Sequence, residues 1–244
     1  MDRTVPFIRK GLIATGIVMA AAILFTACLK HNDNNAQVPV AGLMAFNLAA
    51  DQSPAFITIG GNNLTPSPLG YSNYTGVYEN IYTGSRTVAA YNSSQNAALA
   101  SATANFVQGQ YYSAFFMGFD SSYRMVISTD SLNSLAAGNA YIRYVNAIAD
   151  SVNQPAVTIT SGSTNIVSEN APYGTVSPFK PVAAGNISIA VKNAVNATDT
   201  SRTITVNQNG IYTILLSGVP GQTDPWKRVQ VRYIPNGIIA DSSK

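Results

Sequence analysis

Two residue types that often carry chemistry occur once each in this sequence, as Cys28 and His31. A catalytic nucleophile needs a base held within hydrogen-bonding distance. His31 follows Cys28 by three residues in a short polar segment, so it is poorly placed for that role. A zinc site is equally unsupported. We therefore expect no catalytic residue, no metal and no cofactor, and a protein that is not an enzyme.

The start of the chain has the order of a secretory signal. Arg3, Arg9 and Lys10 precede an uncharged apolar run that extends from residue 11 to residue 27. The junction Phe25-Thr-Ala-Cys28 resembles the lipobox of bacterial lipoproteins, although an aliphatic residue is usual where Phe25 stands. The resemblance implies cleavage before Cys28 and a diacylglycerol on its sulfur. Two or more acyl chains give stable anchoring in a membrane.

We therefore expect a lipoprotein signal peptide over 1–27, as an N-terminal signal helix, and a lipidated tether over 28–39. The expected location is the outer membrane of a bacterial cell envelope, facing the periplasm or the cell surface, with the membrane as partner through Cys28. Two alternatives stay open. The apolar run is at the lower limit of length for an uncleaved transmembrane helix, and Cys28 could instead be a core thiol behind an ordinary signal peptide.

The composition after residue 27 excludes some functions. Removal of residues 1–27 takes away three of the 14 basic residues and one of the 11 acidic residues, which leaves a net charge of +1. No basic stripe remains to bind a phosphate backbone, so we expect no nucleic-acid partner. With Cys28 lipidated, no thiol is left for a disulfide.

The most informative feature is an internal repeat with a period of roughly 100 residues. The segment Ala41–Asp51 aligns with Ala140–Asp150, and each is followed by a Pro-Ala pair and an alternating apolar run. Further on, Leu69-Gly-Tyr71 aligns with Ala171-Pro-Tyr173. The segment Gly84-Ser-Arg-Thr-Val-Ala-Ala90 aligns with Gly185-Asn-Ile-Ser-Ile-Ala-Val191, and Gly109–Gly118 aligns with Gly210–Gly218, with Tyr111 opposite Tyr212.

Short runs rich in Val, Ile, Thr, Tyr and Phe, separated by Gly, Pro, Asn and Asp, are typical of strands. We predict an all-β fold of two tandem immunoglobulin-like β-sandwich domains, each with about seven strands in about 100 residues. The predicted first domain is 40–130, the linker 131–138, the second domain 139–238 and the C-terminal tail 239–244. Residues 94–105 contain a run of alanines, but their counterpart favours a loop leading into a strand.

The second repeat resembles the family called domain of unknown function 4397. The resemblance lies in Ala140-x-Ile-Arg-x-Val-Asn-Ala-x-Ala-Asp150, Pro181-Val-Ala-Ala-Gly185 and Gly210-Ile-Tyr-Thr-Ile-Leu215. The first repeat departs from it where Met44 replaces the usual Arg. The resemblance covers nearly all of the chain after the tether, once per copy. It implies a secreted or lipid-anchored β-sandwich of unassigned activity.

Tyrosines are the best candidates for ligand binding, because an aromatic face with a polar tip suits glycan or protein contacts. We single out Tyr74 and Tyr78, which have no counterpart in the second copy. Tyr111, Tyr173 and Tyr212 are more typical of a core.

Asp51 and Asp150 are equivalent, each four residues after an asparagine, Asn47 or Asn146. Such a pair suits a Ca²⁺ or sugar-hydroxyl site. The more ordinary interpretation, which we favour, is turn chemistry.

These observations predict a non-enzymatic, lipid-anchored envelope protein that acts as a binding or structural β-sandwich module, in adhesion or glycan capture. The expected partner besides the membrane is a glycan or another envelope protein, and the expected state is a monomer. Two alternatives stay open. A fimbrial or polymer subunit would exchange strands at an open sheet edge, and a glycan hydrolase would need two carboxylates in one cleft.

Overall fold

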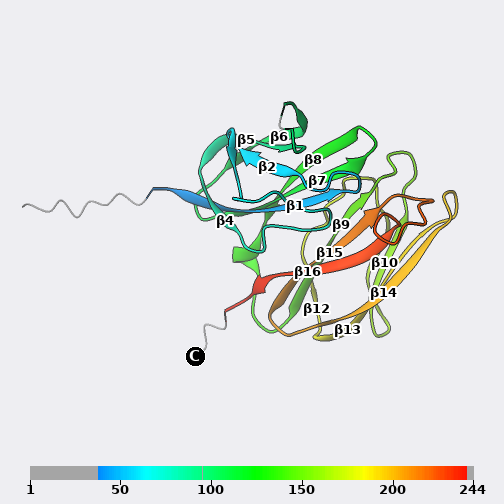
Figure 1. The fold of residues 1–244 in the computed structure, drawn as a ribbon. Helices are drawn as coiled ribbons and strands as arrows, with labels where there is room; N and C mark the ends of the chain where they lie inside the picture. Colours follow the sequence, from blue (N-terminus) through cyan, green and yellow to red (C-terminus); the bar gives the residue numbers. More distant parts are fainter. Residues whose placement is uncertain (1–37, 95, 241–244) are drawn as a thin grey trace, which may run out of the picture. The chain divides into compact units, whose positions relative to one another are not determined.

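The computed structural model describes residues 38–94 and 96–240. In the described residues, the first half contains eight strands: β1 (Val40–Ala49), β2 (Phe56–Ile59), β3 (Asn62–Asn63), β4 (Glu79–Tyr82), β5 (Gly84–Tyr91), β6 (Ala98–Phe106), β7 (Tyr111–Phe119) and β8 (Ser122–Asp130). The second half contains another eight: β9 (Ala140–Ile148), β10 (Ala156–Ser161), β11 (Thr164–Asn170), β12 (Lys180–Val182), β13 (Gly185–Asn193), β14 (Thr198–Val206), β15 (Gly210–Gly218) and β16 (Gln230–Ile238). Figure 1 shows both sets.

The two halves have the same sheet topology. In the first half the strand orders are β4-β1-β7-β8 and β3-β2-β5-β6, and in the second half they are β12-β9-β15-β16 and β11-β10-β13-β14. In each half one pair of neighbours is parallel, β1 with β7 and β9 with β15, and the other pairs are antiparallel. The predicted duplication is therefore visible in the order of the strands.

The all-β prediction is confirmed, since a single 3-10 turn, η1 (Leu132–Ser134), is the one helical element in the part of the chain that the structure describes. It lies in the predicted linker. The alanine-rich segment forms β6, as predicted. Each half has eight strands where about seven were expected. Within residues 38–94 and 96–240, no helix has the length and apolarity to cross a bilayer. The predicted signal helix lies outside the described residues.

Each half has a core between its own two sheets. In the first half the cluster includes Leu43, Val88 and Phe116, and in the second it includes Ile142, Ile189 and Leu216. Each cluster draws side chains from both sheets of its half, so each half is a two-sheet sandwich whose inner faces exclude water. The burial of these aliphatic and aromatic groups is the main favourable term for folding.

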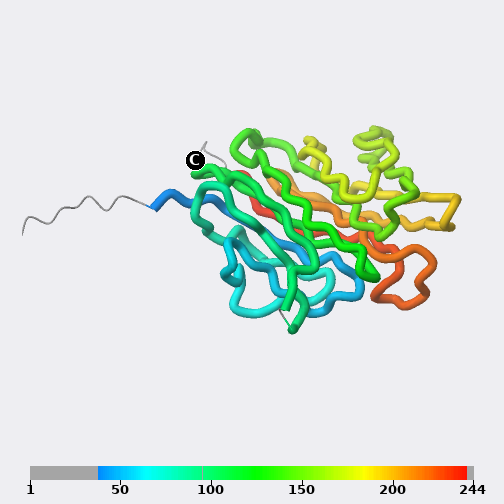
Figure 2. The backbone as a smooth tube through the Cα atoms, turned by 90° about the horizontal axis from the view of Figure 1, so that it is seen from above, coloured from blue at the N-terminus to red at the C-terminus, as the bar shows by residue number. Residues whose placement is uncertain are grey.

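A third cluster joins the halves. It contains Phe46 and Phe115 from the first half together with Val145, Leu215 and Ile234 from the second. The strands β1, β7, β9 and β15 are consequently buried on both faces. This explains why these strands are continuously apolar in sequence, whereas β13 alternates. Residues 39–244 form one compact unit, and Figure 2 shows its two halves beside each other.

The strand register corrects one detail of the sequence alignment. Gly118 and Gly218 occupy the same place opposite the ends of β1 and β9. This makes Tyr112, not Tyr111, the counterpart of Tyr212. Both hydroxyls accept a hydrogen bond of 3.0 Å from a backbone N–H five residues earlier in the chain. The alignment was shifted because it matched Gly109, which precedes β7, with Gly210, which is the first residue of β15.

Candidate functional site

The structure places Tyr74 and Tyr78 against the cluster between the halves. Both side chains are half-buried. The Tyr74 ring stacks on Phe46 with centroids 5.6 Å apart, and the Tyr78 ring meets Tyr111 edge-on at 5.0 Å. Tyr74 and Tyr78 are thus packing residues here, and a ligand role for them stays a prediction.

Tyr78 belongs to a buried network that we call the inter-half polar cluster. The cluster consists of Tyr78, Ser113, Asp130, Arg143, Thr213 and Asn236. Its centre is an ion pair between Arg143 of β9 and Asp130 of β8, two side chains with almost no exposed surface. Arg143 also donates to the Ser113 hydroxyl at 2.8 Å and to the Thr213 hydroxyl at 2.9 Å.

The groups of this cluster satisfy one another. Asp130 accepts hydrogen bonds from Arg143, from the Tyr78 hydroxyl at 2.6 Å and from the Ser113 hydroxyl at 2.6 Å. Burial raises the pKa of Tyr78 well above its usual value, and the charge and hydrogen bond of Asp130 raise it further. Because the charged groups are already engaged, the cluster is suited to holding the two halves together, and not to binding a ligand.

Three of the four paired Asn and Asp residues accept hydrogen bonds from backbone N–H groups close to them in the chain. Asn146 donates to the Ala171 carbonyl at 2.8 Å and accepts from the Ile148 N–H at 3.1 Å, and Asn47 makes the matching bonds to Leu69 and Ala49. Asp150 accepts from the backbone N–H groups of residues 152 and 153 and from the side chains of residues 153 and 196. These bonds agree with the turn interpretation, whereas Asp51 accepts from the Asp120 N–H at 2.9 Å and the Tyr123 hydroxyl at 2.8 Å, both distant in the sequence. Among the described residues, no group of three or more His, Cys, Asp or Glu side chains is placed to hold a metal.

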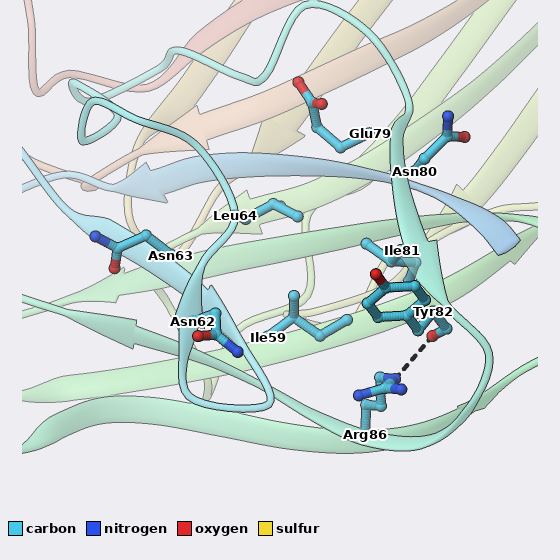
Figure 3. Close-up of a pocket in the computed structure, with 9 residues that line it drawn as sticks. All are labelled: Ile59, Asn62, Asn63, Leu64, Glu79, Asn80, Ile81, Tyr82 and Arg86. Carbon is cyan, nitrogen blue, oxygen red and sulfur yellow. Dashed lines mark hydrogen bonds between the residues drawn. The ribbon is translucent and has the colours of Figure 1, made fainter. Parts of the chain in front are cut away.

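An open pocket lies at one end of the first sandwich (Figure 3). Its volume is about 280 Å³. We call it the Arg86 pocket, and it is lined by Ile59, Asn62, Asn63, Leu64, Glu79, Asn80, Ile81, Tyr82 and Arg86. The β2–β3 hairpin supplies one wall, while β4 and the start of β5 supply the other. The size is near the small end of ligand pockets, which run from roughly 300 to 1,000 Å³.

The walls of the Arg86 pocket combine an apolar floor with polar sides. Ile59, Leu64 and Ile81 provide aliphatic surface between the walls. Three asparagine side chains offer both donors and acceptors. Tyr82 is 61% exposed. In Figure 3 Glu79 lies at one end of the pocket and Arg86 at the other.

Arg86 is held in place by the backbone beside it. Its Nε donates to the Tyr82 carbonyl at 2.8 Å and to the Thr83 carbonyl at 3.3 Å. The guanidinium carbon lies 5.6 Å from the centroid of the Tyr82 ring. Ordering of the side chain before a ligand arrives lowers the entropy lost on binding.

The second half has different side chains at the equivalent positions. Arg86 is on the core-facing side of β5 with Val88, and its counterpart on β13 is Ile187, which is fully buried. The register of β4 and β12 makes Ala183 the counterpart of Tyr82.

Glu79 is matched in the second half by Lys180, whose Nζ donates to the Ile166 carbonyl at 3.3 Å. The copies therefore differ at this end of the sandwich: Glu79, Tyr82 and Arg86 line a pocket in the first half, and Lys180, Ala183 and Ile187 stand at their positions in the second.

Sequence reasoning missed the Arg86 pocket, although a signal was present. The alignment of the copies already places the charged Arg86 opposite Ile187 in an alternating strand. A cation at a core-facing position is unusual unless it is paired or reaches solvent. The difference between Arg86 and Ile187 therefore identifies the end of the sandwich at which the surfaces of the two copies differ.

Comparison with known proteins gives a family for part of the chain. Residues 41–160 match the family described as Domain of unknown function (DUF4397). The matched range covers the first half and continues through β9 into β10 of the second. No curated protein matches the chain. Cys28 and His31 lie outside the described residues.

Proposed function

We propose that the protein is a non-enzymatic binding module of the bacterial envelope that captures glycan in the Arg86 pocket. The observation that carries this proposal is the set of groups in the pocket: an exposed aromatic ring, a fixed guanidinium and three amides around an aliphatic floor. A sugar ring offers C–H faces to aromatic and aliphatic surface, and its hydroxyls pair with amides and charged groups. The module is a pair of immunoglobulin-like sandwiches in this proposal.

The proposed anchor is a diacylglycerol on Cys28, which would hold the protein in the outer membrane. The protein is a monomer in this proposal. The basic, apolar and small-residue order of 1–27 supports it. Mass spectrometry of the mature protein tests it directly. We expect an N-terminal Cys28 that carries acyl chains. A retained Met1 or an unmodified Cys28 would reject the anchor without touching the binding proposal.

The acidic groups of the pocket favour binding over hydrolysis. Glycoside hydrolysis normally uses two carboxylates on either side of the scissile bond, roughly 5–10 Å apart. Among the residues that line the Arg86 pocket, Glu79 is the single carboxylate. This supports capture of an intact glycan.

Glycan-array binding by the full chain tests the proposal. We expect a set of bound glycans, and we expect Tyr82→Ala to lose them, because this change removes the exposed ring of the pocket. Trp226→Ala is the matched control, since Trp226 is an aromatic side chain of the second half that is 69% exposed. Binding that survives Tyr82→Ala but is lost with Tyr74→Ala would move the site to the packed tyrosine and refute our assignment.

A further inference from the structure

We infer that the Arg86 pocket selects a terminal sugar that carries a carboxylate, with the carboxylate at Arg86 and the far side of the ring at Glu79. This inference rests on the proposed function and specifies its ligand class. The first observation concerns the ion-pair partners of the Arg86 guanidinium. The ion pairs of the described residues are Arg143–Asp130 and Lys192–Asp199, so Arg86 has no carboxylate partner among them.

The contacts of Arg86 fix which of its nitrogens are available. In the described part of the chain, Nε is the guanidinium nitrogen that donates a hydrogen bond, to the Tyr82 and Thr83 carbonyls. The edge formed by the two terminal nitrogens is then left for a ligand. This edge presents parallel N–H groups that match the two oxygens of a carboxylate.

Glu79 sets the orientation of the ligand. It lies at the end of the pocket away from Arg86 (Figure 3), where its negative charge repels an anion and its oxygens accept hydrogen bonds from hydroxyls. Asn80, next to it on β4, also lines the pocket, but its side chain lies on the opposite side of the strand from Glu79 (Figure 3). An acidic sugar therefore fits with its carboxylate toward Arg86.

The charge of the pocket favours a carboxylate over a phosphate. Arg86 is the single cation and Glu79 the single anion among the lining residues. A phosphate group with nearly two negative charges is usually held by several cations or by a helix N-terminus or loop of backbone N–H groups. A carboxylate has one charge, which one guanidinium matches.

Binding to matched sugar pairs tests this inference. The full chain is titrated with glucuronate- and glucose-terminated disaccharides of the same linkage, together with the galacturonate and galactose pair and a glucose 6-phosphate-terminated analogue. We expect the acidic member of each pair to bind about tenfold tighter or more, since a hydrogen bond to a charged partner contributes on this scale. The preference should weaken as salt concentration rises.

Arg86→Gln should remove the preference and keep the weaker binding of the neutral sugars. Arg202→Gln is the matched control, because Arg202 also stacks on a tyrosine, Tyr233 at 5.1 Å, and donates to a backbone carbonyl. Equal binding of acidic and neutral sugars would overturn the inference and leave the proposed function standing. Tighter binding of the phosphate analogue would overturn the carboxylate assignment. The absence of binding to any glycan would overturn both proposals.

Discussion

At the residue level, the inter-half polar cluster shows how one substitution between the copies changes the core. The first copy has Met44 on β1, and the second has Arg143 at the equivalent position on β9. Arg143 is buried, and its charge is compensated by Asp130 from the first half. Removal of one partner of a buried pair leaves a charge without compensation, which destabilises more than the intact pair stabilises.

We predict that Arg143→Met lowers the free energy of unfolding by about 3–5 kcal/mol. The double variant Arg143→Met with Asp130→Asn should recover part of this loss, because it leaves no unpaired charge in the interior. Urea unfolding of the two single variants and the double variant measures the coupling. If the double variant loses the sum of the two single losses, the pair is not a coupled unit.

Ionisation of Tyr78 lowers the free energy of unfolding of the protein at alkaline pH. Its pKa in the folded protein is raised, first by burial and then by Asp130, while the unfolded chain titrates near a pKa of about 10. Since the folded state keeps the proton longer, the stabilisation is complete below pH 10 or so and is lost as pH rises above that value.

We therefore expect the free energy of unfolding to fall more steeply in the wild type than in Tyr78→Phe above about pH 10, by up to about 1.4 kcal/mol per pH unit. Denaturant unfolding at a series of pH values from 8 to 12 measures both slopes. Parallel slopes for the two proteins would contradict the assignment of this proton to Tyr78.

At the level of the strands, β7 shows that a strand of the central sheets is buried on both of its faces. Neighbouring residues of a strand point to opposite faces. Phe115 lies in the cluster between the halves, and Phe116 lies in the core of the first half. Both are fully buried.

We predict that Phe115→Ala and Phe116→Ala each destabilise the protein by about 3–5 kcal/mol. In a strand with one solvent-facing side, one of the two changes would be nearly neutral. Val107→Ala, at a half-exposed turn position, is the control and should stay within about 0.5 kcal/mol. Thermal unfolding compares the three variants, and a neutral Phe115→Ala would show that the halves do not pack through β7.

The strands and the duplication follow from the sequence, because alternation, turn residues and the repeat are local signals. The parallel pairing of β1 with β7 does not, since it joins segments that are distant in the chain. The burial of the central strands on both faces was also missed. Their apolar runs are compatible with any buried strand, and only the packing of Phe115 against the second half identifies what covers them.

Tyr74 and Tyr78 show the same limit for the candidate site. Both were singled out because an aromatic face with a polar tip suits ligand contacts; their side chains pack at the interface that the copies share, and a ligand role for them stays a prediction. The Arg86 pocket was missed because its walls, the β2–β3 hairpin and β4, are separated by a loop of 15 residues, from 64 to 78. No local sequence pattern predicts that Asn62 and Tyr82 line the same pocket.

At the level of the whole molecule, the two halves share a buried interface that includes an ion pair and a hydrophobic cluster. We expect residues 39–244 to unfold as one cooperative unit, because neither half can lose its structure without exposing this interface. Scanning calorimetry should give one transition whose calorimetric and van't Hoff enthalpies agree. Two separate transitions would show that the halves are stable independently.

The duplication gives the molecule two equivalent sandwich ends that have diverged. One end has the buried Ile187 and the exposed Ala183, and at the equivalent positions the other has Arg86 and Tyr82, which line the pocket. We propose that the shared framework carries a binding pocket in one copy, while the other copy contributes packing surface and the buried Arg143. In our proposal, function therefore resides in the positions where the copies differ and not in the repeat itself.

The most direct measurement compares two glycan-binding isotherms, one for the wild type and one for a variant that carries the second copy's residues, Tyr82→Ala with Arg86→Ile. Our account predicts that this variant folds with an unchanged circular dichroism spectrum and loses glycan binding. A variant that folds and binds with the affinity of the wild type would contradict the claim that the Arg86 pocket is the site of capture.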